Sequence, residues 1–130
     1  MDLVSMQAAG EVLVVDDDTA IVDLIKEVLI EEGYRVRTAY DGLAGLRAIE
    51  AVPPALLLTD LRMPRMSGME LVGKARASGY DFPIVIIAAT PELAQPLLQL
   101  RHTEYLAKPF DLHQLLDRVA RHVAPVSFSR

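Results

Sequence analysis

Short apolar segments alternate with amphipathic segments along most of this chain. The apolar segments are rich in valine, leucine and isoleucine, and turn-forming residues bound them. Continuous apolar runs of this kind are typical of strands buried on both faces, as in a parallel sheet covered by helices. The five runs lie near residues 11–15, 35–39, 55–59, 83–89 and 103–107.

The segments between these runs have the spacing of amphipathic helices. One apolar stripe covers residues 21–29 and is followed by Gly33, a residue suited to the end of a helix, and another covers residues 112–123. Residues typical of helix starts precede other segments. These start signals are Ser67 with Glu70, Asp111 with Gln114, and Thr90 followed by Pro91.

Five strands alternating with five helices predict an α/β fold of the (βα)5 type. Its parallel sheet would lie between two layers of helices, joined by right-handed crossovers. The length of 130 residues predicts one domain. We expect that domain to span residues 11–123, with an N-terminal extension over 1–10 and a C-terminal tail over 124–130.

The composition excludes several classes of protein. Without cysteine, the chain has no disulfide scaffold, thiol nucleophile or cysteine-ligated metal. A formal charge of -5 argues against direct nucleic-acid binding, which needs a positive face. The apolar runs are too short to span a bilayer, and residues 1–10 lack the features of a secretory signal. We therefore expect a cytoplasmic protein that does not engage a membrane.

Acidic residues follow two of the predicted strands where each strand ends. Asp16, Asp17 and Asp18 follow the first strand, and Asp60 follows the third. In open α/β sheets, sites form beyond the carboxyl ends of the strands, where the strand order reverses. With the strand order 2-1-3-4-5, that reversal would bring Asp16, Asp17 and Asp60 together.

Carboxylates held this close repel one another, by about 4 kcal/mol per pair at a separation of about 4 Å and a dielectric constant of about 20. Mg²⁺, which prefers oxygen ligands, would offset that repulsion. Lys108, at the end of the fifth strand, would bring a positive charge to the same edge. A helix-capping role explains Asp18 but not the whole set. No glycine-rich turn follows the first strand, which argues against a dinucleotide site.

Three motifs resemble those of the receiver domains of two-component response regulators. The pair DD at 16–17 matches the acidic pair of that family, and DLRMPRMSG at 60–68 matches its phosphoacceptor segment. YLAKPF at 105–110 matches the segment that carries an aromatic switch residue, a lysine and a proline. The resemblance covers about residues 11–123 and implies a flavodoxin-like three-layer sandwich.

The resemblance implies a role for each matching residue. Asp60 would accept a phosphoryl group from a phosphohistidine on a sensor histidine kinase or phosphotransfer protein. Asp17, Asp60 and the backbone carbonyl of Arg62 would bind Mg²⁺ directly. Asp16 would act largely through a bound water, and Lys108 would neutralise the phosphoryl oxygens. The same groups would permit slow self-hydrolysis.

One position departs from the family pattern. Ala88, at the end of the fourth strand, stands where the family normally has a serine or threonine that binds the phosphoryl group. Thr90 is expected to cap the next helix, which we predict to be short or irregular; the alternative is a bulge that moves Thr90 into the switch position. Tyr105 matches the aromatic switch residue, and Lys108–Pro109 resembles the cis peptide of the family. Ala88 predicts weakened coupling between phosphorylation and shape change.

The expected output is docking to a downstream effector or output domain. The resemblance places that contact, and a homodimer contact, on the face of the fourth helix, fifth strand and fifth helix. On this interpretation the chain is a signalling switch rather than an enzyme.

Two other functions stay open at this point. The first is a pseudo-receiver, an interaction module that works without phosphorylation, which Ala88 favours and the complete set of acidic residues and lysine opposes. The second is a Mg²⁺-dependent phosphatase that forms an aspartyl phosphate on the first aspartate of a D-x-D motif. That motif would be Asp16 with Asp18 as the second acid, although such enzymes usually need a cap or a longer core.

Overall fold

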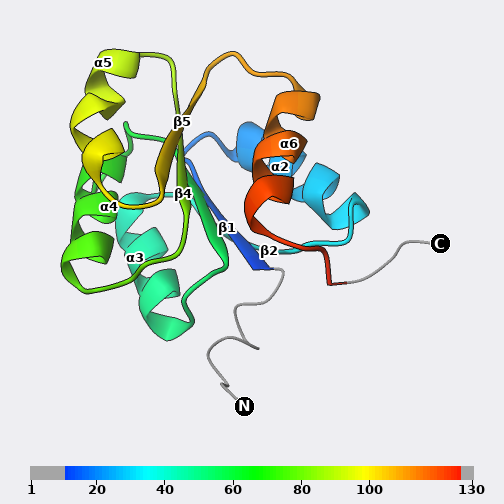
Figure 1. Cartoon of the computed structure of the whole chain (residues 1–130), viewed down its shortest axis with the longest axis horizontal. Coiled ribbons are helices and arrows are strands. Elements are labelled where there is room, and N and C mark those ends of the chain that lie inside the picture. Colours follow the sequence, from blue (N-terminus) through cyan, green and yellow to red (C-terminus); the bar gives the residue numbers. More distant parts are fainter. Residues whose placement is uncertain (1–10, 127–130) are drawn as a thin grey trace.

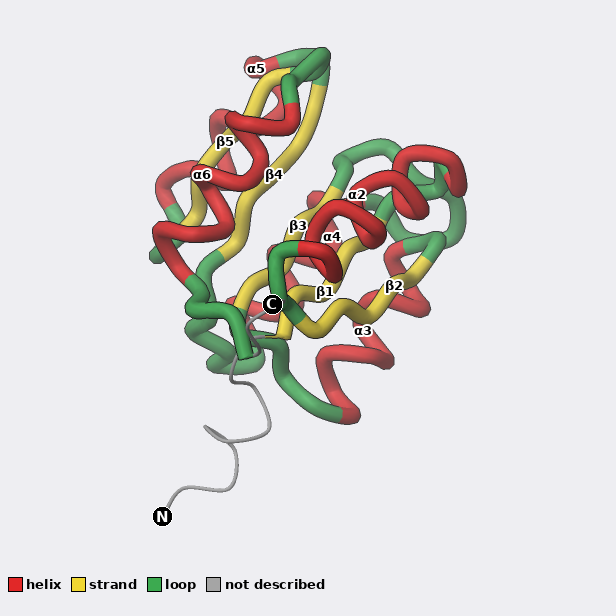
Figure 2. The backbone as a smooth tube through the Cα atoms, turned by 90° about the vertical axis from the view of Figure 1, so that its right-hand side faces the viewer, coloured by secondary structure: helices red, strands yellow, loops and turns green. Residues whose placement is uncertain are grey.

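A computed structural model describes residues 11–126 of the chain (Figure 1). A five-stranded parallel sheet in the order β2-β1-β3-β4-β5 lies between two layers of helices (Figures 1 and 2). The predicted α/β three-layer sandwich and its strand order are confirmed. The predicted N-terminal extension, and residues 127–130 of the predicted tail, lie outside the described residues.

The elements follow the predicted alternation closely. The strands are β1 (Glu11–Val15), β2 (Arg35–Ala39), β3 (Leu56–Thr59), β4 (Ile84–Ala88) and β5 (Thr103–Ala107). The helices are α2 (Thr19–Glu31), α3 (Gly42–Ala51), α4 (Gly68–Ala77), α5 (Pro91–Ala94) and α6 (Leu112–His122), and the 3₁₀ segment η1 (Gln95–Gln99) follows α5 directly. Between residues 11 and 126, no helix has the length and apolar character needed to cross a membrane.

Each face of the sheet packs against its own helix layer because successive side chains of a strand point to opposite faces. In β1, Val12 and Val14 belong to the core formed with α2 and α6. Leu13 and Val15 belong to the core formed with α3, α4 and α5. Figure 1 shows these two helix layers on opposite sides of the sheet. Burial on both faces explains why the strands are apolar without alternation.

The helix ends form where the sequence signals predict them. Asp18 is the N-cap of α2, and its side chain accepts hydrogen bonds from the N–H groups of Ala20 and Ile21. Gly33 follows this helix with a φ of 95°, in the left-handed region that glycine adopts without a Cβ clash. Complete capping boxes start α4 and α6. They join Ser67 with Glu70 and Asp111 with Gln114.

The helix after β4 is short, as predicted. The α-helical part has 4 residues and passes into the 3₁₀ turn of η1. Pro96 lies at the start of that turn and has no N–H with which to continue the α-helical bonding. Thr90 holds the N-cap position, but its side chain makes no capping hydrogen bond. The predicted position of Thr90 is therefore confirmed, whereas the predicted capping interaction is wrong.

Candidate functional site

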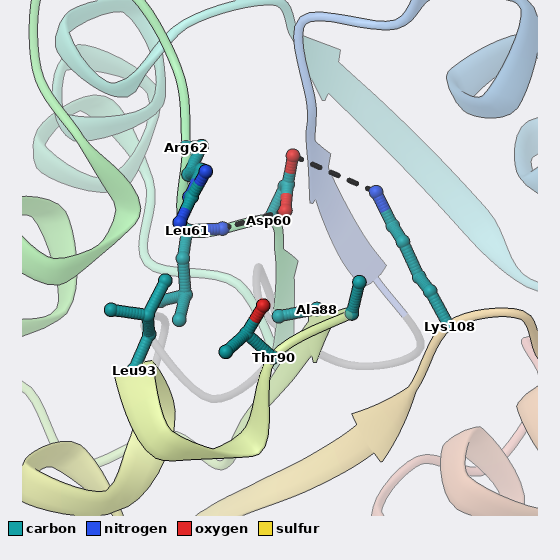
Figure 3. A pocket seen from close by; sticks show the side chains of 8 residues that line it. Asp60, Leu61, Arg62, Ala88, Thr90, Leu93 and Lys108 are labelled. Atoms are coloured by element: carbon teal, nitrogen blue, oxygen red, sulfur yellow. Dashed lines mark hydrogen bonds and ion pairs between the residues drawn. The ribbon is translucent and has the colours of Figure 1, made fainter.

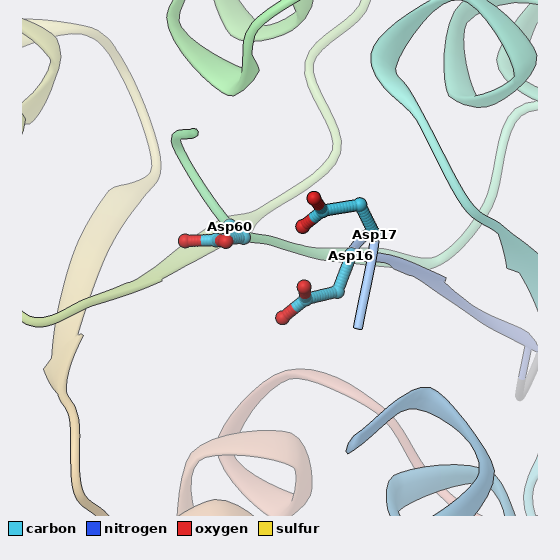
Figure 4. A group of neighbouring side chains, drawn as sticks. All are labelled: Asp16, Asp17 and Asp60. Carbon is cyan, nitrogen blue, oxygen red and sulfur yellow. The ribbon is translucent and has the colours of Figure 1, made fainter. Parts of the chain in front are cut away.

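Three aspartates meet at the carboxyl ends of β1 and β3. Asp16 and Asp17 follow β1, and Asp60 follows β3, where its N–H donates to the carbonyl of Val15 at 3.0 Å. Each aspartate offers one carboxylate oxygen, and these oxygens lie within 4.8 Å of one another. Figure 4 shows Asp16 and Asp17 directed toward the strand end that carries Asp60. The expected proximity of Asp16, Asp17 and Asp60 is therefore found in the structure.

The backbone fixes one oxygen of two of these carboxylates. Asp16 is buried, and its Oδ1 accepts a hydrogen bond from the N–H of Asp18 at 3.0 Å. Asp60 is partly buried, and its Oδ1 accepts from the N–H of Leu61 at 2.8 Å. Asp17 is exposed. In Asp16 and Asp60, the second oxygen is left to face Lys108.

Lys108 provides the positive charge of the site. Its Nζ lies 3.4 Å from Oδ2 of Asp16 and 3.6 Å from Oδ2 of Asp60. The backbone N–H of Lys108 donates to the carbonyl of Ala88, which ties the end of β5 to the end of β4. The Lys108–Pro109 peptide is cis, as the resemblance implied. Figure 3 shows the lysine side chain reaching toward Asp60.

The charge of this cluster matches a divalent cation. Three carboxylates and one ammonium group leave two negative charges in a small volume. Burial raises the pKa of Asp16, while the N–H of Asp18 and the charge of Lys108 act in the opposite direction. The available ligands are all oxygen atoms, which Mg²⁺ prefers over nitrogen or sulfur. The residues present therefore fit a magnesium ion.

A pocket of about 200 Å³ opens beside Asp60 (Figure 3). Residues from the ends of β3, β4 and β5 and from the start of α5 line it. They are Asp60, Leu61, Arg62, Ala88, Ala89, Thr90, Leu93 and Lys108. The pocket thus combines the Asp60 carboxylate and the Lys108 ammonium with mostly apolar walls. It can hold a small anionic group next to the carboxylate cluster.

The residues at the predicted switch position lie on one side of this pocket. Ala88 contributes a methyl group and no hydroxyl, whereas Thr90 brings the only hydroxyl among the lining residues of the described chain. Tyr105 is half-buried, and its hydroxyl donates to the backbone carbonyl of Ala88 at 2.8 Å. The partner of the tyrosine hydroxyl is therefore a backbone carbonyl at the end of β4 and not the side chain of another residue.

Gly68 explains the close approach of α4 to the segment that begins at Asp60. A Cβ at this position would lie 1.9 Å from the carbonyl oxygen of Asp60, so any other residue would push the helix away. The N–H of Gly68 donates to the carbonyl of Leu61 at 2.8 Å. The loop from Asp60 to Ser67 is therefore closed tightly at its base.

The same loop has a second contact that the sequence analysis missed. Arg65 Nε donates to Oδ2 of Asp41 at 2.9 Å, and Oδ1 of Asp41 accepts from the N–H of Ala44 as the cap of α3. These two bonds lower the pKa of Asp41, the Ala44 N–H having the larger effect. The capping spacing could have identified Asp41 as a helix start. Nothing in the sequence pairs it with Arg65, 24 residues away.

An apolar groove adjoins the pocket between the start of α2 and the loop that leads to α6. Leu24 and Leu112 are 49% and 39% exposed, so both side chains present apolar surface in this groove. The lining residues are Ile21, Leu24, Ala89, Lys108, Pro109, Phe110, Asp111 and Leu112. Lys108 and Ala89 line both cavities, so the groove adjoins the pocket beside Asp60.

Comparisons with known proteins agree with this geometry. The family model of the response regulator receiver domain matches residues 12–120. Response regulator MprA of Mycobacterium ulcerans (strain Agy99) is 36% identical over 110 residues, which cover 83% of this chain and 47% of the relative. The MprA protein of Mycobacterium tuberculosis (strain ATCC 25618 / H37Rv) is also 36% identical, over 83% of this chain and 48% of its own. This chain thus spans about half the length of these relatives.

Solved structures show the same fold. The receiver domain of Francisella response regulator 1452 has a TM-score of 0.80 and 31% identity, and covers 86% of this chain and 94% of its own. The chemotaxis response regulator CheY4 of Vibrio cholerae has a TM-score of 0.79 and 33% identity, with 88% and 99% covered. The region matched by the family model, residues 12–120, contains the whole sheet except Glu11 of β1, together with Asp16, Asp17, Asp60 and Lys108. On this sequence and structural evidence, the chain belongs to the receiver domains of response regulators.

Proposed function

We propose that this chain is a phosphoaspartate receiver in which Asp60 accepts a phosphoryl group with the help of Mg²⁺. We assign the receiver to residues 11–123. The observation that carries the proposal is the position of Lys108 Nζ, 3.4 Å from Asp16 and 3.6 Å from Asp60, beside a cluster of three carboxylates. One ammonium group and a divalent cation would together balance that cluster. A purely structural role does not require so much charge at one edge of the sheet.

Asp60 is the nucleophile in this proposal. The N–H of Leu61 holds Oδ1, and Oδ2 is the oxygen on the side of Lys108. A carboxylate oxygen attacks the phosphorus of a phosphohistidine presented by the donor protein. The P–N bond breaks, its electron pair returns to the imidazole ring, and Asp60 becomes an acyl phosphate. Attack by water on that phosphorus later restores Asp60, so the modification is temporary.

The surrounding residues balance the charge of the transferred group. The Lys108 ammonium group binds phosphoryl oxygens, whose charge is spread in a loose transition state. Asp17, Asp60 and the carbonyl of Arg62 would hold the metal directly, and Asp16 would act largely through a bound water. When bound, Mg²⁺ supplies Lewis-acid neutralisation of the phosphoryl oxygens.

We propose that the phosphohistidine donor docks in the apolar groove. The donor must bring its phosphorus into contact with Asp60, and the groove adjoins the pocket beside that residue, with Ala89 and Lys108 lining both. The exposed side chains of Leu24 and Leu112 offer apolar contact area next to the charged site. An amphipathic helix of a histidine kinase or phosphotransfer protein fits this surface. Its apolar side chains would lie in the groove, and its phosphohistidine would lie next to Lys108.

The output is proposed to pass through the face formed by α5, β5 and α6. Tyr105 of β5 contacts the carbonyl of Ala88 at the pocket, so it joins the site to that face. Phosphorylation would bias contacts there with an effector, an output domain or a second receiver. The acidic charge supports protein partners rather than direct nucleic-acid binding. We place this signalling in the cytoplasm and assign the chain no substrate turnover beyond its own phosphorylation and dephosphorylation.

Mass spectrometry of the intact protein tests the proposal. Incubation with acetyl phosphate and Mg²⁺ should add one phosphoryl mass to the wild type, and EDTA should prevent the addition. Asp60→Asn should stay unmodified, whereas the control Asp18→Asn, which keeps a good helix cap, should be modified like the wild type. Modification of the Asp60 variant would overturn the assignment and favour Asp16 as the nucleophile of a phosphatase.

The absence of a hydroxyl at Ala88 favours one second candidate, the pseudo-receiver. In that case the fold would bind partners through the same surfaces without a phosphorylation cycle. A wild type that acquires no phosphoryl group from acetyl phosphate or from a phosphorylated histidine kinase would support it. Modification of Asp60 by either donor would exclude it.

A further inference from the structure

The loop from Asp60 to Ser67 is fastened at two places. At its base, Gly68 packs directly on the carbonyl of Asp60. At its tip, the carbonyl of Met66 lies so close to Gly42 that a Cβ there would come within 2.0 Å of it. Beside this contact, Arg65 Nε donates to Oδ2 of Asp41 at 2.9 Å. The second fastening joins the loop to the start of α3, which lies outside the segment from Asp60 to Ser67.

Arg65 takes an unfavourable backbone conformation to make this contact. Its φ is 68°, in the left-handed region that crowds the Cβ of any residue other than glycine. Among the non-glycine residues of the described chain, only Arg65 and His102 have a positive φ. Glycine would suit this backbone better, and the contact that the arginine side chain makes from this conformation is the bond to Asp41.

Asp41 is well placed to anchor that side chain. Its carboxylate is largely buried, with a side-chain exposure of 12%, and Oδ1 is fixed by the N–H of Ala44 at 2.8 Å. Only Oδ2 is left for Arg65. Because the helix cap already fixes the carboxylate, a bond from Arg65 restrains the loop rather than moving Asp41.

We propose that Asp41 and Arg65 are positioning residues that hold the loop ready for Mg²⁺. The inference rests on the proposed function, in which Asp60 and the carbonyl of Arg62 bind the metal from this loop. Both groups belong to the segment between the two fastenings. A loop ordered in advance loses less conformational entropy when the ion binds, and the affinity is correspondingly higher. Neither side chain touches the metal or the phosphoryl group in this proposal.

A double-mutant cycle on magnesium affinity tests this role. Asp41→Asn keeps the helix cap and removes the charge, and Arg65→Gly removes the side chain and relieves the left-handed strain. Both variants should therefore fold. By titration calorimetry, each should bind Mg²⁺ about threefold to fivefold more weakly than the wild type, the range that a partly exposed ion pair can contribute. The double variant should be no weaker than either single variant, because the two residues act as one unit.

A matched control removes an ion pair that lies elsewhere. Arg101 pairs with Asp81 at 3.1 Å, both largely exposed, and neither residue lines the pocket beside Asp60. Arg101→Ala should leave the affinity for Mg²⁺ unchanged. In metal-free protein, hydrogen exchange of the amides of residues 61–67 should be faster in the Arg65 variant than in this control.

The outcomes separate this inference from the proposed function. A wild type that does not bind Mg²⁺ overturns both. A wild type that binds, with single variants of equal affinity and equal loop exchange, overturns the positioning role alone. Losses in the single variants that multiply in the double variant would also overturn it, since the residues would then act independently. Arg65→Lys, which retains the charge, should recover part of the affinity.

Discussion

Replacement of Asp16 by asparagine should stabilise the metal-free protein. Asp16 is only 4% exposed and shares the site with the carboxylates of Asp17 and Asp60. Burial raises its pKa, which means that the ionised form is less favourable here than in water. Asparagine keeps an oxygen to accept the N–H of Asp18 and removes the charge. The variant therefore reports how much the negative charge of Asp16 lowers the free energy of unfolding.

The distances give the size of the effect. With a dielectric constant of about 20, each carboxylate within 4.8 Å repels Asp16 by at least about 3.5 kcal/mol. Lys108, at 3.4 Å, attracts it by about 5 kcal/mol. The remaining repulsion is about 2 kcal/mol, and solvent around the exposed Asp17 reduces it. We expect the free energy of unfolding to rise by about 1–2 kcal/mol.

Urea unfolding followed by far-UV circular dichroism measures this gain, in EDTA and at neutral pH. Asp23→Asn is the control, because Asp23 is exposed on α2 and its replacement changes the net charge equally. Mg²⁺ at ten times its dissociation constant should add about 1.4 kcal/mol to the wild type and less to the Asp16 variant. An Asp16 variant that is no more stable than the wild type in EDTA, or a control that gains as much, would show that repulsion among these carboxylates does not destabilise the fold.

Three further predictions concern the switch, the groove and the acid stability. Ala88→Thr should enlarge the amide chemical-shift changes around Tyr105 when beryllofluoride, a phosphoryl mimic, is added; equally large changes in the wild type would show that Ala88 does not weaken the switch. Leu24→Asp should slow phosphorylation by a histidine kinase at least tenfold and leave modification by acetyl phosphate unchanged, whereas equal slowing of both would exclude docking in the groove. The lowered pKa of Asp41 means that its carboxylate stabilises the fold fully above pH 3.8, and that this contribution is lost as the pH falls further. Wild type and Asp41→Asn should therefore converge in stability below pH 3.8, and a constant difference measured by urea unfolding would contradict this.

Local signals were sufficient to predict most of the fold. The apolar runs predicted every strand to within a residue or two, because strands buried on both faces leave little room for polar side chains. The capping boxes of α4 and α6 form as their spacing predicts, since such contacts involve neighbouring residues only. The prediction that Asp16, Asp17 and Asp60 lie close together is confirmed, because the strand order places the ends of β1 and β3 side by side at one edge of the sheet.

Contacts between distant segments could not be predicted in the same way. The pairing of Asp41 with Arg65 depends on how two loops pack, which no local pattern encodes. The hydroxyl of Tyr105 donates to the backbone carbonyl of Ala88. Every residue has such a carbonyl, so the residue types in the sequence do not indicate which one accepts this bond. Thr90 holds the capping position and lines the pocket without making the capping bond, and its type and spacing in the sequence do not reveal whether that bond forms.

In the proposed function, Asp60 carries the phosphoryl group. Sodium borohydride reduces an acyl phosphate of aspartate to homoserine, so the modified residue can be located by mass spectrometry of peptides. After incubation with acetyl phosphate and Mg²⁺, we expect homoserine at position 60 and unmodified aspartate at positions 16 and 17. Homoserine at position 16, or at no position in a protein that has bound Mg²⁺, would contradict this assignment.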